Sequence, residues 1–234
     1  MSLKNIKKYT PGFNIHDIQK KYNLKKVIKL ASNENPFISK DVLTFIKKSN
    51  HKLNLYPDSN PHELHRLLAN TIGHRMTSNN IILGNGSNEI LEFIVRANVD
   101  NKSEVIIPKH SFLVYEIISK LQNAKIIMSK PDNDKASENY LGINLESVKG
   151  KITKKTKLIF IANPANPTGT YIKLSEIDNF LQLVPKKTSV IIDEAYYEYL
   201  NPKTKEFVRL FKKIIFCFVF CFFTPRLSRT FFLL

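Results

Sequence analysis

Two short apolar runs on either side of a helical pattern constrain the fold of this 234-residue chain more than any other feature. The runs Lys157–Ala162 and Ser189–Ile192 are rich in β-branched residues, and Ser175–Val184 between them has the apolar spacing of a helix. This order predicts a βαβ unit, in which two parallel strands end at the same edge of a sheet. Ligands of open α/β sheets bind just beyond that edge.

Polar residues follow both strands at this edge. The first strand ends in the loop Asn163-Pro164-Ala165-Asn166-Pro167-Thr168-Gly169, and the second ends in Asp193-Glu194-Ala195-Tyr196. Because prolines fix the backbone, we expect a stiff loop that holds Asn166 outward. Asp193 follows an apolar strand, where a carboxylate is costly unless a cation pairs with it, and a protonated pyridine nitrogen would be a suitable cation. Taken singly, both features also occur as ordinary turns of α/β proteins.

A second signal is a glycine turn between an apolar run and a helical pattern. Ile81–Leu83 is predicted to be a short strand, and Glu89–Ala97 has the spacing of a helix. Between them lies Gly84-Asn85-Gly86-Ser87-Asn88, whose glycines let a bound group approach the backbone closely. The N–H groups and dipole of a helix N-terminus attract an anion, although an ordinary helix cap would have the same sequence.

The remaining pattern predicts an α/β protein throughout. Further strands are expected at Glu104–Ile107 and Lys125–Ser129, and helices at Ser39–Lys48 and at Pro61–Gly73, the latter with Leu64, Leu67 and Leu68 on one face.

Charge and cysteine content exclude several classes of function. The chain has 36 Lys and Arg against 20 Asp and Glu, a formal net charge of +16. The lysines are scattered and are not interleaved with aromatic residues, which argues against a nucleic-acid partner. The two cysteines, Cys217 and Cys221, provide no metal site. The N-terminus lacks an apolar secretory segment, so we expect a cytoplasmic protein with no membrane partner.

Taken together, the glycine turn, the Asn-Pro loop and the Asp-Glu-Ala-Tyr segment resemble the pyridoxal-phosphate (PLP) aminotransferases of fold type I, most closely the histidinol-phosphate aminotransferases. The likeness extends over essentially all of residues 1–200, with the motifs in family order. It implies an α/β fold with a mixed, mostly parallel sheet and helices on both faces. It also implies PLP as the cofactor.

The resemblance assigns the cofactor's ring to four residues. Asp193 would hold the proton of the ring nitrogen, and Asn166 and Tyr196 would bond the phenolic oxygen. Phe112 would cover the ring face, with His110 as the less favoured alternative.

The cofactor's phosphate and the substrate would be held by other segments. Gly86, Ser87 and Asn88 would cradle the phosphate, together with Tyr56 acting across the interface of a homodimer. Asn33, Glu34 and Asn35, in an Asn-Glu-Asn-Pro motif, would lie at the mouth of the substrate site. The implied substrates are glutamate and a phosphorylated amino or oxo acid.

One essential part of the family's site is absent from the sequence. The family carries its Schiff-base lysine in a Ser-Lys motif after the Asp-Glu-Ala-Tyr segment, and no Ser-Lys pair follows Asp193 here. We therefore assign no catalytic residue. Residues 214–223 form a Phe- and Cys-rich run, shorter than the ~20 residues needed to cross a bilayer. We expect an N-terminal arm at 1–30, a partial large domain at 31–213 and an aberrant tail at 214–234, the product of a frameshift.

The intact relative would move an amino group between glutamate and imidazole-acetol phosphate in histidine biosynthesis, and we expect this chain to be a non-catalytic fragment of such an enzyme. Three alternatives stay open. The first is a threonine-phosphate decarboxylase or another class I/II aminotransferase. The second is a catalytically dead protein that binds PLP or pairs with an intact enzyme. The third is a peripheral membrane protein that uses the tail with Arg226 and Arg229.

Overall fold

The computed structural model describes residues 12–35, 37–49, 54–56, 58–72 and 77–200, together with the backbone of 214–217. The chain divides into two compact units. Described residues up to 59 belong to the smaller unit, and those from 60 onward belong to the larger unit.

The smaller unit contains two amphipathic helices, α1 (Ile15–Tyr22) and α2 (Lys40–Ser49). The Asn14 side chain caps α1 by accepting a hydrogen bond from the His16 amide, at 2.8 Å. Helix α2 lies within one residue of the helix expected at Ser39–Lys48. Of the arm expected at 1–30, residues 1–11 lie outside the described part of the chain.

A parallel sheet forms the centre of the larger unit. Its strands are β1 (Glu104–Pro108), β2 (Lys125–Ser129), β3 (Thr156–Ala162), β4 (Ser189–Asp193) and β5 (Ile214–Cys217), in the order β2-β1-β3-β4-β5. All the pairs within this described sheet are parallel. The α/β fold with a mainly parallel sheet, expected from the sequence, is confirmed. The βαβ unit β3-α7-β4 lies within one residue of its expected bounds.

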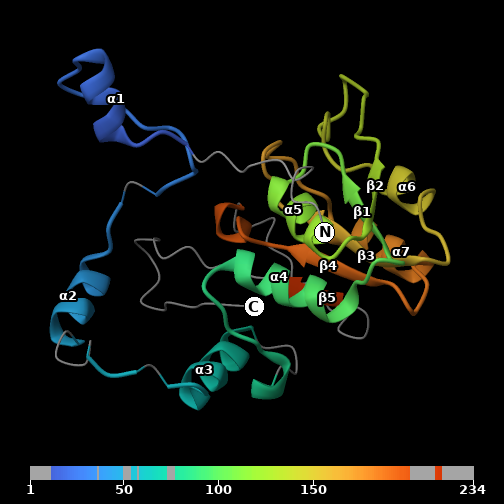
Figure 1. Ribbon diagram of the computed structural model, residues 1–234, viewed down its shortest axis with the longest axis horizontal. Coiled ribbons are helices and arrows are strands. Elements are labelled where there is room, and N and C mark those ends of the chain that lie inside the picture. The colour runs from blue at the N-terminus through green and yellow to red at the C-terminus, as the bar shows by residue number, and fades with distance from the viewer. Residues whose placement is uncertain are drawn as a thin grey trace. The chain divides into compact units, whose positions relative to one another are not determined.

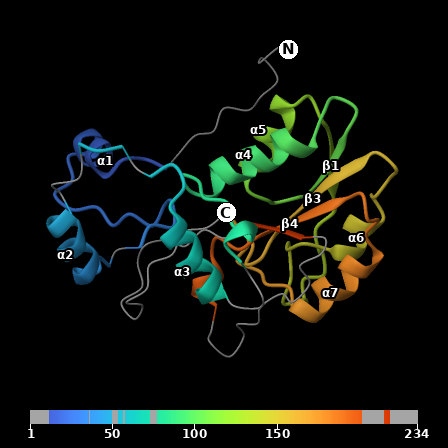
Figure 2. The same ribbon diagram turned by 90° about the horizontal axis from the view of Figure 1, so that it is seen from below.

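Helices cover both faces of the sheet, as Figures 1 and 2 show. Helices α4 (Ser87–Asn98) and α5 (Leu113–Leu121) lie on one face, and α6 (Leu145–Lys149) and α7 (Leu174–Leu183) lie on the other. Right-handed crossovers explain this arrangement, because the chain moves from β1 to β2 in one direction and from β2 to β3 in the other. The remaining described elements of the larger unit are α3 (His62–Ile72) and the 3₁₀ turns η3 (Ser78–Asn80) and η4 (Tyr197–Tyr199).

The core lies on both sides of the central strands. The side chains of Val105–Ile107, Leu158–Ile161 and Val190–Ile192 are almost completely buried, which is why these strands read as continuous apolar runs rather than alternating ones. Strand β2 lies at the edge of the sheet and is more exposed, with Met128 45% accessible. Within the described ranges, no helix combines the length and the apolar character needed to cross a bilayer.

Two local expectations are wrong. Residues Ile81–Leu83 form no strand: Ile81 is buried and Leu83 packs against the core from a half-buried position, whereas Ile82 is 61% exposed. In α3 the buried face consists of Leu68, Ala69 and Ile72, whereas Leu67 is 43% exposed. The buried face of the helix is therefore not the one expected from Leu64, Leu67 and Leu68, because Leu67 lies toward solvent.

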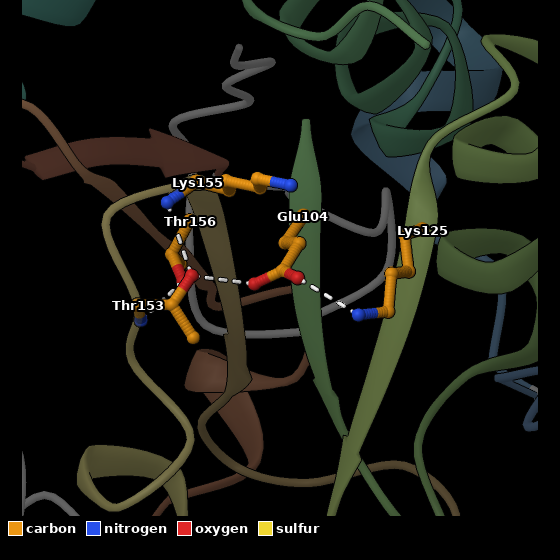
Figure 3. A network of polar contacts seen from close by, with 5 residues as sticks. All are labelled: Glu104, Lys125, Thr153, Lys155 and Thr156. Atoms are coloured by element: carbon orange, nitrogen blue, oxygen red, sulfur yellow. Dashed lines mark hydrogen bonds and ion pairs between the residues drawn. The ribbon is translucent and has the colours of Figure 1, made fainter. Parts of the chain in front are cut away.

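A polar network ties three strands together at the edge opposite the carboxyl ends (Figure 3). The buried Glu104 carboxylate, at the start of β1, accepts a hydrogen bond from Thr153 Oγ1 at 2.6 Å and pairs with Lys125 Nζ at 3.0 Å. The Thr156 hydroxyl accepts from the Thr153 amide at 2.9 Å, which fixes the turn into β3. The Thr153 and Lys125 donors lower the pKa of Glu104.

We expect Glu104→Gln to lower the free energy of unfolding by about 1–2 kcal/mol at pH 7, because the substitution weakens two charge-assisted contacts of a buried group while Lys125 remains mostly exposed. Since folding lowers the pKa of Glu104, its contribution is present above the unfolded pKa and disappears as the pH falls. The difference between variant and parent in urea titrations should therefore shrink in acid. The exposed Glu138→Gln is the matched control, and an equal loss in both variants would contradict the role of the network.

Candidate functional site

The strand order puts the reversal of chain direction across the sheet at β1 and β3, and ligands of open α/β sheets bind at the carboxyl ends of the strands at such a point. From β1 the chain crosses one face of the sheet to reach β2, and from β2 it crosses the other face to reach β3. Loops 109–112 and 163–170, which follow the neighbouring strands β1 and β3, therefore lead to opposite faces of the sheet. Strand β4 follows β3 in the sheet, and Ala162 pairs with Asp193 in register. The Asn163 loop and Asp193 therefore begin side by side, and the Asn163 amide donates to the Asp193 carbonyl oxygen at 2.9 Å.

Asp193 is a buried carboxylate, 5% exposed, held at both oxygens. The Ala195 amide donates to Oδ1 at 3.1 Å, and the Tyr115 hydroxyl donates to Oδ2 at 2.5 Å. Within the described part of the chain, Asp193 makes no ion pair. A buried carboxylate without a cation is costly, so this site suits a bound group that brings a positive charge.

Burial acts on two neighbouring acids here. It raises the pKa of Asp193, which the hydrogen bonds from Tyr115 and Ala195 counteract. It raises the pKa of Glu194 to about 8, with the charges of Glu198 and Asp193 adding to the effect. At neutral pH Glu194 is thus mainly uncharged and does not repel a charge on Asp193. Sequence analysis singled out Asp193 but did not anticipate a second buried acid.

The Asn-Pro loop is braced by the asparagine that sequence analysis did not select. The buried Asn163 side chain donates to the Ile172 carbonyl at 2.9 Å and accepts from the Ile172 amide at 2.8 Å, which closes the loop from within. Asn166 is half-buried at the turn of the loop, and its outward orientation toward a ligand stays a prediction. The Thr168 and Thr170 hydroxyls share a further hydrogen bond of 2.9 Å.

Helix α4 begins at the same carboxyl edge of the sheet. Only residues 99–103 connect the end of α4 to the start of β1. The helix therefore runs antiparallel to the strands, and its first turn lies at the carboxyl edge of the sheet (Figure 1). Gly86 is the N-cap with φ +78°, a conformation that favours glycine, and open space surrounds its Cα where a side chain would stand. The helix starts two residues earlier than expected, at Ser87, while Asn88 is exposed in its first turn.

The other expected residues of the larger unit lie at the same ends of the strands. Phe112 is the half-buried N-cap of α5 and packs edge-on against Tyr115, with ring centroids 5.9 Å apart. His110 is exposed and has φ +61°. Tyr196 is half-buried beside Tyr199, with centroids 6.1 Å apart. None of these positions by itself tests a role in ligand binding.

Four expected residues belong to the smaller unit. Asn33, Glu34 and Asn35 lie in a turn between α1 and α2, where Glu34 pairs with Lys29 and the Asn35 side chain accepts from the Phe37 amide. Tyr56 is fully exposed. Their roles stay predictions.

A separate cavity of about 380 Å³ lies between α6, α7 and the loop around residue 140. Asp132, Glu146 and Phe180 contribute to its lining, and none of the expected cofactor or substrate residues does. The candidate site is therefore the carboxyl edge of the sheet, where the expected residues of the larger unit lie.

Comparison with known proteins identifies the family of this chain. The profile of the family "Aminotransferase class I and II" matches residues 25–217. A histidinol-phosphate aminotransferase of Idiomarina loihiensis is 39% identical over 201 residues, which are 85% of this chain and 52% of the relative. One of Carboxydothermus hydrogenoformans is 37% identical over the same shares of the two chains. The chain thus spans about half the length of these curated relatives.

The fold agrees with a solved structure. The crystal structure of the histidinol-phosphate aminotransferase of Sinorhizobium meliloti, in complex with pyridoxal-5'-phosphate, superposes with a TM-score of 0.76. The match covers 88% of this chain and 55% of that one at 22% identity. Since the family profile spans most of the sequence, this chain belongs to the class I and II aminotransferases.

Proposed function

We propose that this chain forms the PLP-binding part of a histidinol-phosphate aminotransferase-like enzyme of histidine biosynthesis. The observation that carries the proposal is the buried Asp193 carboxylate, held at both oxygens and paired with no cation among the described residues. A protonated pyridine nitrogen supplies the missing positive charge. The open glycine N-cap of α4, at the same edge of the sheet, fits the cofactor's phosphate.

The residues present fit PLP, which when bound supplies an electron-withdrawing ring for amino-group transfer. Asp193 would hold the ring proton, and Asn166 and Tyr196 would donate to or accept from the phenolic oxygen. Phe112 would exclude water from the ring face. Gly86, Ser87 and Asn88 would bind the phosphate through backbone and side-chain donors.

The substrate and the assembly are further parts of the proposal. The relatives' names support glutamate and a phosphorylated oxo acid as substrates, with Asn33, Glu34 and Asn35 at their entrance. We propose a cytoplasmic homodimer in which Tyr56 reaches the neighbouring cofactor phosphate. Its complete exposure and the exposed apolar side chains of α1 and α2, such as Phe45, suit residues covered by a partner.

We also propose that the family-like part of the chain ends just after β5, a few residues beyond the boundary expected at residue 213, and that an aberrant tail follows it. The family profile reaches residue 217 and β5 continues the sheet from Ile214 to Cys217, which favours a break just after β5. The chain contains no Ser-Lys pair after Asp193, so we propose that it holds the cofactor without a catalytic lysine.

The test is to compare the affinities of the chain for PLP and for pyridoxal by equilibrium dialysis. We expect PLP to bind at least about tenfold more tightly, because a helix N-terminus and its dipole stabilise an anion by up to ~2 kcal/mol. Gly86→Ala should remove most of this preference, since φ +78° disfavours a side chain. Gly150→Ala is the matched control, at an ordinary φ of −64° and with 3.5 Å to the nearest atom. Equal affinities for the two compounds would contradict the proposal.

A further inference from the structure

Tyr115 makes a contact with Asp193 that the expected cofactor roles leave unexplained. Its hydroxyl donates to Asp193 Oδ2 at 2.5 Å, within the range of charge-assisted O–H···O⁻ bonds. The residues are 78 positions apart in sequence, one in the first turn of α5 and the other at the end of β4. Such a contact exists only because the fold brings α5 over the carboxyl end of the sheet.

The Tyr115 ring is fixed independently of its hydroxyl. It is 1% exposed and stacks on Phe160 of β3, with centroids 4.5 Å apart and planes inclined by 8°. Phe112 packs against its edge. The ring therefore stays in place when the hydroxyl alone is removed, which separates its packing from its hydrogen bond.

We propose that Tyr115 is a positioning residue, whose hydroxyl fixes the orientation of the Asp193 carboxylate and favours its ionised form for binding a cationic ring. The Ala195 amide holds Oδ1 and Tyr115 holds Oδ2, so the carboxylate cannot rotate, yet each oxygen retains a lone pair for a ligand. The consequence for the cofactor rests on the proposed function, whereas the hold on Asp193 does not.

The surroundings leave few other groups to perform this task. Glu194 is the neighbouring acid on the same segment, and β3 contributes Ala162 and the Asn163 amide beside Asp193. Strand β5 places Cys217 alongside Asp193 in register. No described lysine or arginine pairs with Asp193. Tyr115 is therefore the side-chain donor that offsets the effect of burial on this carboxyl.

The first test measures the pKa of Asp193 directly, without any cofactor. The full chain is labelled with carboxyl-¹³C aspartate, the Asp193 signal is assigned with Asp193→Asn, and its pH titration is compared between the parent and Tyr115→Phe. We expect the Asp193 pKa to rise in Tyr115→Phe and to stay at the parent value in Tyr140→Phe, which removes a hydroxyl from an exposed ring. An unchanged Asp193 pKa in Tyr115→Phe overturns the proposal.

The second test measures PLP affinity against pH. Tyr115→Phe should bind PLP about tenfold more weakly at neutral pH, and the acid limb of its affinity profile should move to higher pH, so that the loss shrinks as the pH rises. A loss that is uniform across pH indicates a merely structural role and overturns the proposal. If the parent chain binds no PLP, the proposed function fails, and the NMR titration still decides the role of Tyr115. Should Tyr115→Phe not fold, the ¹³Cζ signal of Tyr115 is compared between the parent and Asp193→Ala, which removes the acceptor, and an identical shift overturns the contact.

Discussion

The purified 234-residue chain is expected to show no amino transfer from glutamate to an oxo acid, with a rate at least about 10⁴-fold below that of a complete relative. Positioned general bases contribute roughly 10²–10⁴-fold to rates, and covalent attachment of the cofactor adds to this. The family takes both from one lysine in a Ser-Lys motif, which does not follow Asp193 in this sequence. Asp193 and its neighbours would hold the cofactor ring and its proton, but none of them is a lysine in a Ser-Lys motif.

A coupled assay for the oxo-acid product tests this expectation, with the enzyme of Idiomarina loihiensis measured alongside as a positive control. Borohydride reduction in the presence of PLP should label no single lysine of the chain. If one Lys→Ala substitution abolished a measurable rate, or one lysine were labelled uniquely, the base would be present and our assignment of none would be wrong.

The nucleotides downstream of the codon for Cys217 give the complementary result. If the Phe-rich tail is a reading-frame product, another frame should encode a Ser-Lys motif soon after this point. Joining that frame to β5 should restore turnover, because it would supply the amine next to the proposed cofactor site. If neither other frame contained the motif, the tail would have to be treated as a genuine part of the protein.

Asp193→Asn is expected to weaken PLP binding by about 10- to 100-fold. Hydrogen bonds to charged groups are worth ~1.5–3 kcal/mol, and each 1.4 kcal/mol is a factor of ten in affinity. Asparagine keeps the shape and one of the two acceptor oxygens, so the loss reports mainly the charge. Asp134→Asn, an exposed change in a loop remote in sequence, is the control and should leave the affinity unchanged.

The same substitution should have the opposite effect on the stability of the cofactor-free chain. Burial raises the pKa of Asp193 above its unfolded value, so its ionisation opposes folding, and the parent loses stability as the pH rises through the folded-state pKa. Asp193→Asn removes this dependence and should be at least as stable as the parent at neutral pH and above. A variant that lost both PLP affinity and stability across all pH values would indicate a structural role for Asp193.

The apolar patterns were enough to predict β1 to β4, whereas β5 lies in the segment that was expected to be an aberrant tail. Continuous β-branched runs fixed β1, β3 and β4, and the polar residues that end these strands identified Asp193 correctly as a carboxylate at the edge of a buried region. The pattern failed at Ile81–Leu83, because a short apolar run does not show whether a partner strand exists.

The hydrogen bonds inside the site could not be predicted from the sequence, because they depend on tertiary structure. Asn163 and Asn166 have similar sequence surroundings, and only the closed loop shows that Asn163 is the brace. Tyr115 follows Phe112 by three residues, a helical spacing that indicates a shared face, but its bond to Asp193 depends on how α5 crosses the sheet. Likewise, burial of Glu194 beside Asp193 could not be deduced from a strand end.

The protonation state of the ring nitrogen of bound PLP tests the central role of Asp193 most directly. It can be read from the ¹⁵N chemical shift of PLP labelled at the ring nitrogen and bound to the full chain, in the parent and in Asp193→Asn. We predict a protonated nitrogen in the parent at pH values where the nitrogen of free PLP has lost its proton, and an unprotonated nitrogen in Asp193→Asn at the same pH. A nitrogen with the same shift in both proteins would show that Asp193 is not its partner.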